Sequence, residues 1–239
     1  MTTEGQPSMP VDVGAAKARG GPRIGIVTIV DNDNYGNRLQ NLAMQFLLEG
    51  LGAEPATIVF ANHSPKPPPI RTVKSVAERV RDLGLLGVGR VVYERWNSRR
   101  LADARNARRA RITAFTEKNI REFRTCETDD SWHERFDYFV IGSDQVWNPN
   151  RLPFIAEAFG SFAPPEKRIA FAPSFGVSQI PVELAELYSK GLSGISRLSV
   201  REAAGAHLVN ELTGRDAPVL MDPTLLTSGD HWSSVIHPC

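Results

Sequence analysis

The chain has 239 residues, 41% of them hydrophobic and 23% charged, so it is long enough to bury a core and is ordinary in composition for a globular protein. Its formal net charge of +1 argues against binding to nucleic acid or membrane through the overall electrostatic field. Two distant cysteines, Cys126 and Cys239, form neither a disulfide framework nor a zinc pattern, which favours a reducing, cytoplasmic location.

We expect the first residues not to form a signal peptide. Residues 1–22 are rich in glycine, proline and small residues and contain no apolar core of a signal peptide, so we expect a disordered tail. No stretch of the chain approaches the roughly 18 consecutive apolar residues of a membrane span. We therefore expect no membrane-spanning segment.

The first ordered segment predicts a strand, a helix and a strand. Residues 23–30 form a short β-branched run that is typical of a buried strand. From Asn37 onward, apolar residues recur at helical spacing, and Gly52 is placed to end that helix. Residues 56–60 predict the second strand, which completes a βαβ unit.

The alternation continues along the chain. A proline-rich loop at 62–69 precedes two expected helices, over 71–83 and 89–124. Further strands are expected at 136–141, 168–172, 195–200 and 219–221, with helices at 182–192 and 201–213. Such alternation predicts an α/β fold, a Rossmann-like parallel sheet with helices on both faces.

The segment 90–124 is strongly basic, with eleven Arg and Lys residues against four acidic ones. A basic helix can bind nucleic acid or anionic lipid, or it can be a solvated arm that covers a sheet edge. Its aromatic residues, Tyr93, Trp96, Phe115 and Phe123, are spaced like a packing stripe, so we expect no nucleic-acid partner. The five histidines of the chain show no metal-ligand spacing, so we expect no metal site.

The loop "DNDNYGNRLQ" after the first strand is the first candidate site. Ligands of open α/β sheets bind beyond the carboxyl ends of strands, where helix N-termini present unpaired N–H groups. Asn34 or Asn37 could cap the helix, and Gly36 would let the backbone approach a ligand closely. Arg38 adds a cation where the helix dipole disfavours it. The alternative is a plain turn rich in turn-forming residues.

The stretch "GSDQVW" is the second candidate site. Gly142 permits a sharp turn out of the strand, and Ser143 or Asp144 can cap whatever follows. The Asp144 carboxylate could also accept a proton from a substrate hydroxyl. The alternative makes Asp144 a capping residue and Trp147 a core residue.

The stretch "SVREAAG" is the third. Ser199 and Glu202 fit the S-x-x-E capping box, which would place Arg201 in the first helical turn, against the dipole. A guanidinium in that position suggests an anionic partner. A salt bridge from Arg201 to a neighbouring acid such as Asp222 is the alternative.

Taken together, these loops resemble the polysaccharide pyruvyl transferases. The resemblance covers roughly residues 23–232 and rests on four stretches: "NYGNRLQNLAMQ", "FDYFVIGSDQVWNPN", "RIAFAPSFGV" and "ISRLSVREAAGAHLVNELTGRDAPVLMDPTLL". It implies transfer of the pyruvyl unit of phosphoenolpyruvate to sugar hydroxyls of a glycan as a ketal, in exopolysaccharide biosynthesis. Phosphoenolpyruvate is the donor substrate, and no further cofactor is implied.

The resemblance also implies roles for individual residues. Asp144 and Arg201 correspond to site residues, with Arg201 on the donor and Asp144 as base. The expected substrate-binding residues are Asn34, Gly36, Asn37, Arg38, Ser143, Gln145 and Trp147. For Trp147, an apolar platform under a sugar and a place in the core both remain open.

Members of this family resemble the two-domain glycosyltransferase-B arrangement, with the active site between two Rossmann-like halves. By that resemblance, residues 23–224 form the first half, and 225–239 are the start of a truncated second domain or a tail. By the same resemblance, two cases stay open: the chain is active by itself, or it is inactive alone because a separate C-terminal half supplies the missing donor-site residues. The alternatives are a non-catalytic sugar- or anion-binding domain and, second, a nucleic-acid-binding module built on 90–124.

Overall fold

The computed structural model describes residues 20–61, 102–126, 128–151 and 155–235. Most of the expected N-terminal tail lies outside these ranges, as do the proline-rich loop, the helix expected at 71–83 and residues 90–101 of the basic segment.

The described residues form one all-parallel sheet of six strands, in the order β3-β2-β1-β4-β5-β6. The strands are β1 (Arg23–Val27), β2 (Glu54–Val59), β3 (Glu122–Arg124), β4 (Tyr138–Ile141), β5 (Arg168–Ala170) and β6 (Arg197–Leu198). This is the strand order of a Rossmann-like fold, and it reverses direction between β1 and β4. Ligands of such sheets bind beyond the carboxyl ends of the two strands at that reversal.

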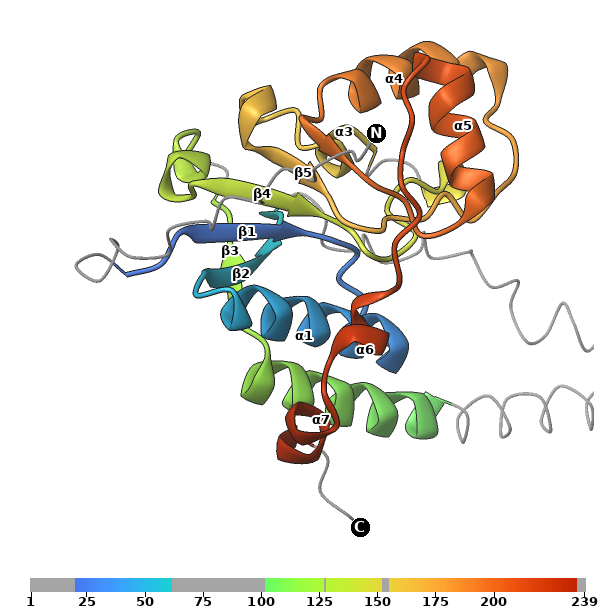
Figure 1. Cartoon of the computed structure of the whole chain (residues 1–239). Coiled ribbons are helices and arrows are strands. Elements are labelled where there is room, and N and C mark those ends of the chain that lie inside the picture. Colours follow the sequence, from blue (N-terminus) through green and yellow to red (C-terminus); the bar gives the residue numbers. More distant parts are fainter. Residues whose placement is uncertain (1–19, 62–101, 127, 152–154, 236–239) are drawn as a thin grey trace, which may run out of the picture.

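Helices lie on both sides of the sheet, as the alternating pattern predicts (Figure 1). They are α1 (Tyr35–Gly50), a helix over 102–119, α3 (Ile155–Ala158), α4 (Val182–Ser193), α5 (Ala203–Thr213), α6 (Pro223–Leu226) and α7 (Gly229–Val235). Short 3-10 helices stand at Trp132–Arg135, Pro149–Arg151 and Pro165–Lys167. Helix α1 and the helix over 102–119 lie on one side of the sheet, and α4 and α5 on the other (Figure 1).

The core has one part on each face, because neighbouring residues of a strand point to opposite faces. On the α1 side, Ile24 and Ile26 of β1 pack with Met44 and Leu48. On the other side, the larger cluster joins strand residues such as Val27 and Phe139 to α4 and α5. Both faces are therefore covered, as a parallel sheet requires.

Several expected boundaries shift, and one strand was missed. The helix expected to run to 124 ends by residue 119, and Glu122–Arg124 instead pairs with β2 as an edge strand. Phe123 packs edge-on against Phe136, so its role is packing, as its spacing predicts. A strand of three residues is too short for its periodicity to be seen in the sequence.

The end of α1 agrees with the expectation. Its last helical residue is Gly50, Leu51 is the C-cap, and Gly52 follows with φ of +80°, a left-handed conformation that glycine adopts without strain. The short strand expected at 219–221 is reduced to an isolated bridge between Val200 and Val219.

Candidate active site

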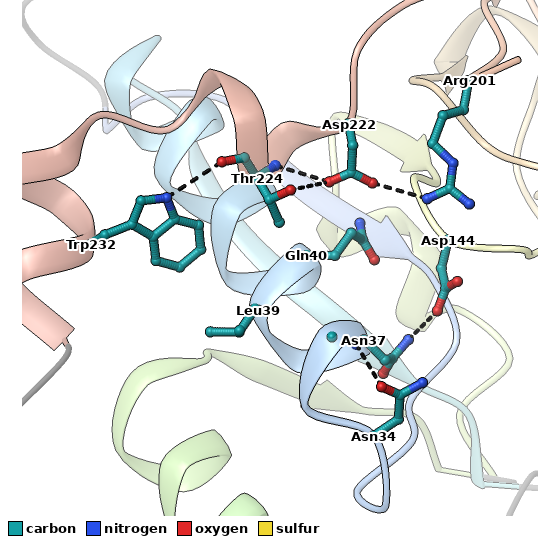
Figure 2. Close-up of a pocket in the computed structure, with 10 residues that line it drawn as sticks. Asn34, Asn37, Leu39, Gln40, Asp144, Arg201, Asp222, Thr224 and Trp232 are labelled. Carbon is teal, nitrogen blue, oxygen red and sulfur yellow. Dashed lines mark hydrogen bonds and ion pairs between the residues drawn. The ribbon is translucent and has the colours of Figure 1, made fainter.

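A cavity of about 560 Å³ opens beyond the carboxyl ends of β1 and β4, where the strand order reverses (Figure 2). Its volume falls within the roughly 300–1,000 Å³ of small-molecule sites. The described residues that line it are Asn34, Gly36, Asn37, Leu39, Gln40, Asp144, Arg201, Asp222, Thr224 and Trp232. The three sequence candidates, far apart in the chain, thus meet at one place.

The loop after β1 is fixed by its own side chains. Asn34 is the N-cap of α1, and its side-chain oxygen accepts a hydrogen bond from the Asn37 N–H at 3.4 Å. The Asp31 carboxylate accepts from the Asp33 N–H at 2.8 Å, which closes the preceding turn. The N-terminus of a four-turn helix therefore borders the cavity, together with Gly36.

Asn37 links this loop to the second candidate stretch. Its Oδ1 accepts hydrogen bonds from the Asp31 N–H and the Arg38 Nε–H, both at 3.0 Å. Two donors at one end of the amide identify that end as the oxygen, so the amide nitrogen points the other way. The Nδ2 group donates to Oδ2 of Asp144 at 2.5 Å.

Asp144 is held at both carboxylate oxygens. Oδ2 accepts from Asn37, and Oδ1 accepts from the backbone N–H of Gln145 at 2.7 Å. Each carboxylate oxygen offers more than one lone pair, so both can accept a further hydrogen bond from a ligand. The arrangement fixes the Asp144 carboxylate at the wall of the cavity.

Arg38 does not face the cavity. Its side chain is fully buried behind Asn37, where Nη2 donates to the Ile29 carbonyl at 2.8 Å and Nη1 lies 3.7 Å from Glu122. Burial lowers the pKa of the Arg38 guanidinium, an effect opposed by the charges of Glu122, Asp31 and Asp144. In this structure Arg38 orients Asn37 and is not placed to touch a substrate.

Asp222 is the centre of a second cluster. One carboxylate oxygen accepts from the Thr224 N–H at 3.0 Å and the Thr224 hydroxyl at 2.7 Å, which makes Asp222 the N-cap of α6. The other oxygen accepts from the Ser143 hydroxyl and from Nη1 of Arg201, each at 3.0 Å. Burial would raise the pKa of Asp222, but these hydrogen bonds outweigh it and hold that pKa below its usual value.

The predicted capping box is wrong. Helix α5 begins at Ala203 after Glu202, which makes no side-chain capping bond, so Arg201 precedes the helix. The Ser199 hydroxyl donates to the Ala170 carbonyl, because Ser199 follows β6 and lies beside β5. Glu202 instead accepts from the Ser174 hydroxyl and the Phe175 N–H. Arg201 both lines the cavity and bridges to Asp222, so the expected salt bridge is present, and the binding of an anion by Arg201 stays a prediction.

Three other predicted residues lie outside the cavity wall. Ser143 is buried and reaches the site only through Asp222. Gln145 turns toward Asn148, which donates to its side-chain oxygen at 3.1 Å. Trp147 is fully buried, its Nε1–H donates to the Ala158 carbonyl, and its ring packs on Phe159, so the structure places Trp147 in the core.

Five of the described lining residues were not predicted as site residues: Leu39, Gln40, Asp222, Thr224 and Trp232. Asp222 was expected only as an alternative salt-bridge partner of Arg201. Thr224 and Trp232 come from α6 and α7, which pack against α1; Phe46 of α1 stacks on His231 at 4.9 Å. The sequence does hold a signal for α6, since the "DPT" stretch places an N-cap acid before a proline at the first helical position. No comparable signal marks Gln40 among the polar residues of α1.

The described part of the chain lacks two further features. No three His, Cys, Asp or Glu residues there are grouped so that they could hold a metal ion. None of the helices described is both long and apolar enough to cross a membrane.

The chain is similar to a known protein family. Residues 34–239 match the family model described as polysaccharide pyruvyl transferase, and that range contains every lining residue of the cavity. No curated protein and no solved structure matches the chain.

Proposed function

We propose that this chain, which belongs to the polysaccharide pyruvyl transferase family, transfers pyruvyl from phosphoenolpyruvate to two hydroxyls of a glycan. The observation that carries the proposal is the meeting of a carboxylate, Asp144, and a guanidinium, Arg201, in one cavity at the reversal of the strand order. A donor with charged groups needs the guanidinium, and an acceptor hydroxyl needs a base.

The reaction balances without any further reagent. Both acceptor oxygens form bonds to C2 of the donor, C3 takes up a proton to become a methyl group, and the bond from C2 to the phosphate oxygen breaks. The acceptor hydroxyls give up two protons, of which one balances the uptake at C3 and the other leaves with phosphate. The proposal therefore includes no cofactor beyond the donor substrate, and we place the reaction in the cytoplasm.

Arg201 is proposed to bind the carboxylate or phosphate of the donor. Its Nη1 is bonded to Asp222, and its Nε lies 3.9 Å from Glu202, so the guanidinium is held from one side while it borders the cavity. The N–H groups at the start of α1 border the same cavity and favour an anion nearby. These two features support a donor at the Arg201 end of the site.

Asp144 is proposed to accept the proton of the acceptor hydroxyl. Asn37 and the Gln145 N–H fix the direction of its carboxylate, which reduces the reorganisation needed when the hydroxyl approaches. Arg38 supports this arrangement from behind through Asn37. In this proposal Asp144 is catalytic, while Asn37 and Arg38 are positioning residues.

Product formation tests the proposal. The full chain is incubated with phosphoenolpyruvate labelled with carbon-13 at C2 and with methyl glycosides of glucose, galactose, mannose and N-acetylglucosamine. We expect a new ketal carbon signal and glycoside-dependent phosphate release, with Asp144→Asn slower by roughly 10²–10⁴-fold, as for loss of a general base. Asp33→Asn is the matched control, because this exposed acid of the same loop pairs with Arg109 and does not line the cavity.

Two results would contradict the proposal: no ketal from the wild-type chain with any glycoside, or equal rates for wild type and Asp144→Asn. Glycoside binding without turnover would instead favour the non-catalytic sugar-binding domain.

The nucleic-acid alternative has less support, since Arg121 pairs with Glu49 and Arg124 with Glu122. Together with Arg109, which pairs with Asp33, these residues show that cations of the basic segment are engaged in ion pairs within the fold.

A further inference from the structure

The two ends of the cavity differ in chemistry. Arg201 and Asp144 stand at one end, and Trp232 and Leu39 stand at the other, with Gln40 between them (Figure 2). The proposed function accounts for the first end only. What the aromatic end binds is a separate question.

The charge of the lining argues against a second anion. Among the described residues that line the cavity, one guanidinium faces two carboxylates, Asp144 and Asp222, and Asp222 is already bonded to Arg201. Phosphoenolpyruvate carries a charge of about −3 at neutral pH, since a phosphoryl group contributes about −2 and a carboxylate the rest. The aromatic end offers no cation of its own, so a neutral ligand suits it better.

Gln40 offers a hydrogen-bond donor that suits a ligand with oxygen atoms. Its side chain is only 4% exposed, and its Oε1 accepts from the Thr28 hydroxyl at 3.5 Å. Its Nε2 group is buried and has no hydrogen-bond partner within the described part of the chain. A buried donor left unpaired is unfavourable, and Gln40 is one of the residues that line the cavity, so a ligand oxygen is a candidate acceptor for this donor.

Trp232 supplies a fixed apolar surface beside Gln40. Its Nε1–H donates to the Thr224 carbonyl at 3.4 Å, and its ring meets Phe46 edge-on with centroids 6.3 Å apart. The indole is thereby held by α6 and by α1. An aromatic ring can cover the C–H face of a pyranose, while a neighbouring amide bonds to the hydroxyls at the rim of that sugar.

We propose that the aromatic end of the cavity is the acceptor subsite, in which Trp232 covers one face of a neutral sugar unit and Gln40 bonds to a sugar hydroxyl. That this sugar is the acceptor of the reaction rests on the proposed function, but the binding of a sugar at this end does not. A sugar held there extends toward Asp144, which faces the same cavity. Trp232 thus takes the role of platform for which Trp147 is too deeply buried.

The test is saturation-transfer NMR of the full chain with the four methyl glycosides named above, without phosphoenolpyruvate. We expect saturation transfer from the wild-type chain to at least one glycoside. Trp232→Ala should abolish it and Trp232→Phe should retain it, because phenylalanine keeps an aromatic face. Gln40→Met should weaken binding roughly tenfold through loss of the hydrogen bond, while Gln40→Glu, which can still bond to a hydroxyl, should weaken it less.

The matched control is Tyr138→Ala, which removes an exposed aromatic ring at the amino end of β4, far from the cavity mouth, and should change nothing. Phosphoenolpyruvate affinity, measured by calorimetry, should be the same in Trp232→Ala as in wild type. No transfer from the wild-type chain to any glycoside would overturn the subsite, as would full transfer from Trp232→Ala. Glycoside binding with no binding of phosphoenolpyruvate would uphold the subsite and refute only the proposed donor.

Discussion

Asn37 shows how one residue connects two distant parts of the chain. Its oxygen accepts from the loop before α1 and from Arg38, and its nitrogen donates to Asp144, which lies after β4. A reversal of this amide would set its NH₂ group against two other donors and leave Asp144 without its partner. The direction of the Asp144 carboxylate therefore depends on residues that do not line the cavity, Arg38 among them.

Arg38 should contribute more to the stability of the fold than its position in the stretch "DNDNYGNRLQ" suggests. Arg38→Met removes a fully buried cation, leaving the Ile29 carbonyl without its donor and Glu122 without its nearest buried charge. We expect the free energy of unfolding, from urea denaturation, to fall by roughly 2–4 kcal/mol, as for one half of a buried ion pair.

The control for this comparison is Arg109→Met. Arg109 is 54% exposed and pairs with Asp33 at 3.5 Å, so its removal should change the free energy of unfolding by less than about 1 kcal/mol. Equal effects of the two substitutions would contradict the interpretation of Arg38 as a buried structural cation.

At the scale of elements, α6 is as important to the site as the loops that the sequence indicates. Asp222 caps α6 while it binds Ser143 after β4 and Arg201 after β6. One carboxylate thus joins three segments and holds Thr224 and Trp232 at the cavity. An exposed turn of similar sequence would lack the bonds to Ser143 and Arg201, so only the folded arrangement distinguishes it from α6.

The lowered pKa of Asp222 makes a prediction about acid stability. A depressed folded-state pKa means that the ionised carboxylate stabilises the fold above the unfolded value of about 3.9, and that this contribution is lost as pH falls through the folded-state pKa. Asp222→Asn, which can still cap a helix, should lower the free energy of unfolding at pH 7 by about 1 kcal/mol. The difference from wild type should shrink toward pH 3.

Urea denaturation at several pH values measures this difference. Asp130→Asn is the control, because it removes an exposed acid outside the Asp222 cluster. Its free energy of unfolding should equal that of wild type at every pH. A gap between wild type and Asp222→Asn that grows as the pH falls would show that the sign of the linkage is wrong.

At the scale of the whole molecule, the sequence predicts the α/β class and the approximate place of the major elements. Hydrophobic periodicity reveals α1 and α4 because they are long enough to show it, and it misses β3, which has three residues. The sequence does not predict the strand order, because the alternation of strands and helices does not determine which strands are neighbours. The contact between Asn37 and Asp144 follows from β4 lying beside β1.

The site was predictable to the extent that loops after strands carry polar residues. That rule identifies Asn34, Asn37, Asp144 and Arg201, which all line the cavity. This rule does not distinguish Trp147, which packs in the core, from Trp232, which α7 places at the cavity. Nor does it find Gln40, because whether a buried amide is paired depends on tertiary neighbours.

The central claim is that Arg201 binds the donor, and calorimetric titration of phosphoenolpyruvate into the full chain tests it most directly. We predict binding to wild type, and for Arg201→Ala a loss of roughly 1.5–3 kcal/mol, as expected for a charge-assisted hydrogen bond. Arg197→Ala, which removes an exposed guanidinium from the amino end of β6, should bind like wild type. Equal affinity in wild type and a folded Arg201→Ala variant, or no binding to the wild-type chain, would contradict the claim.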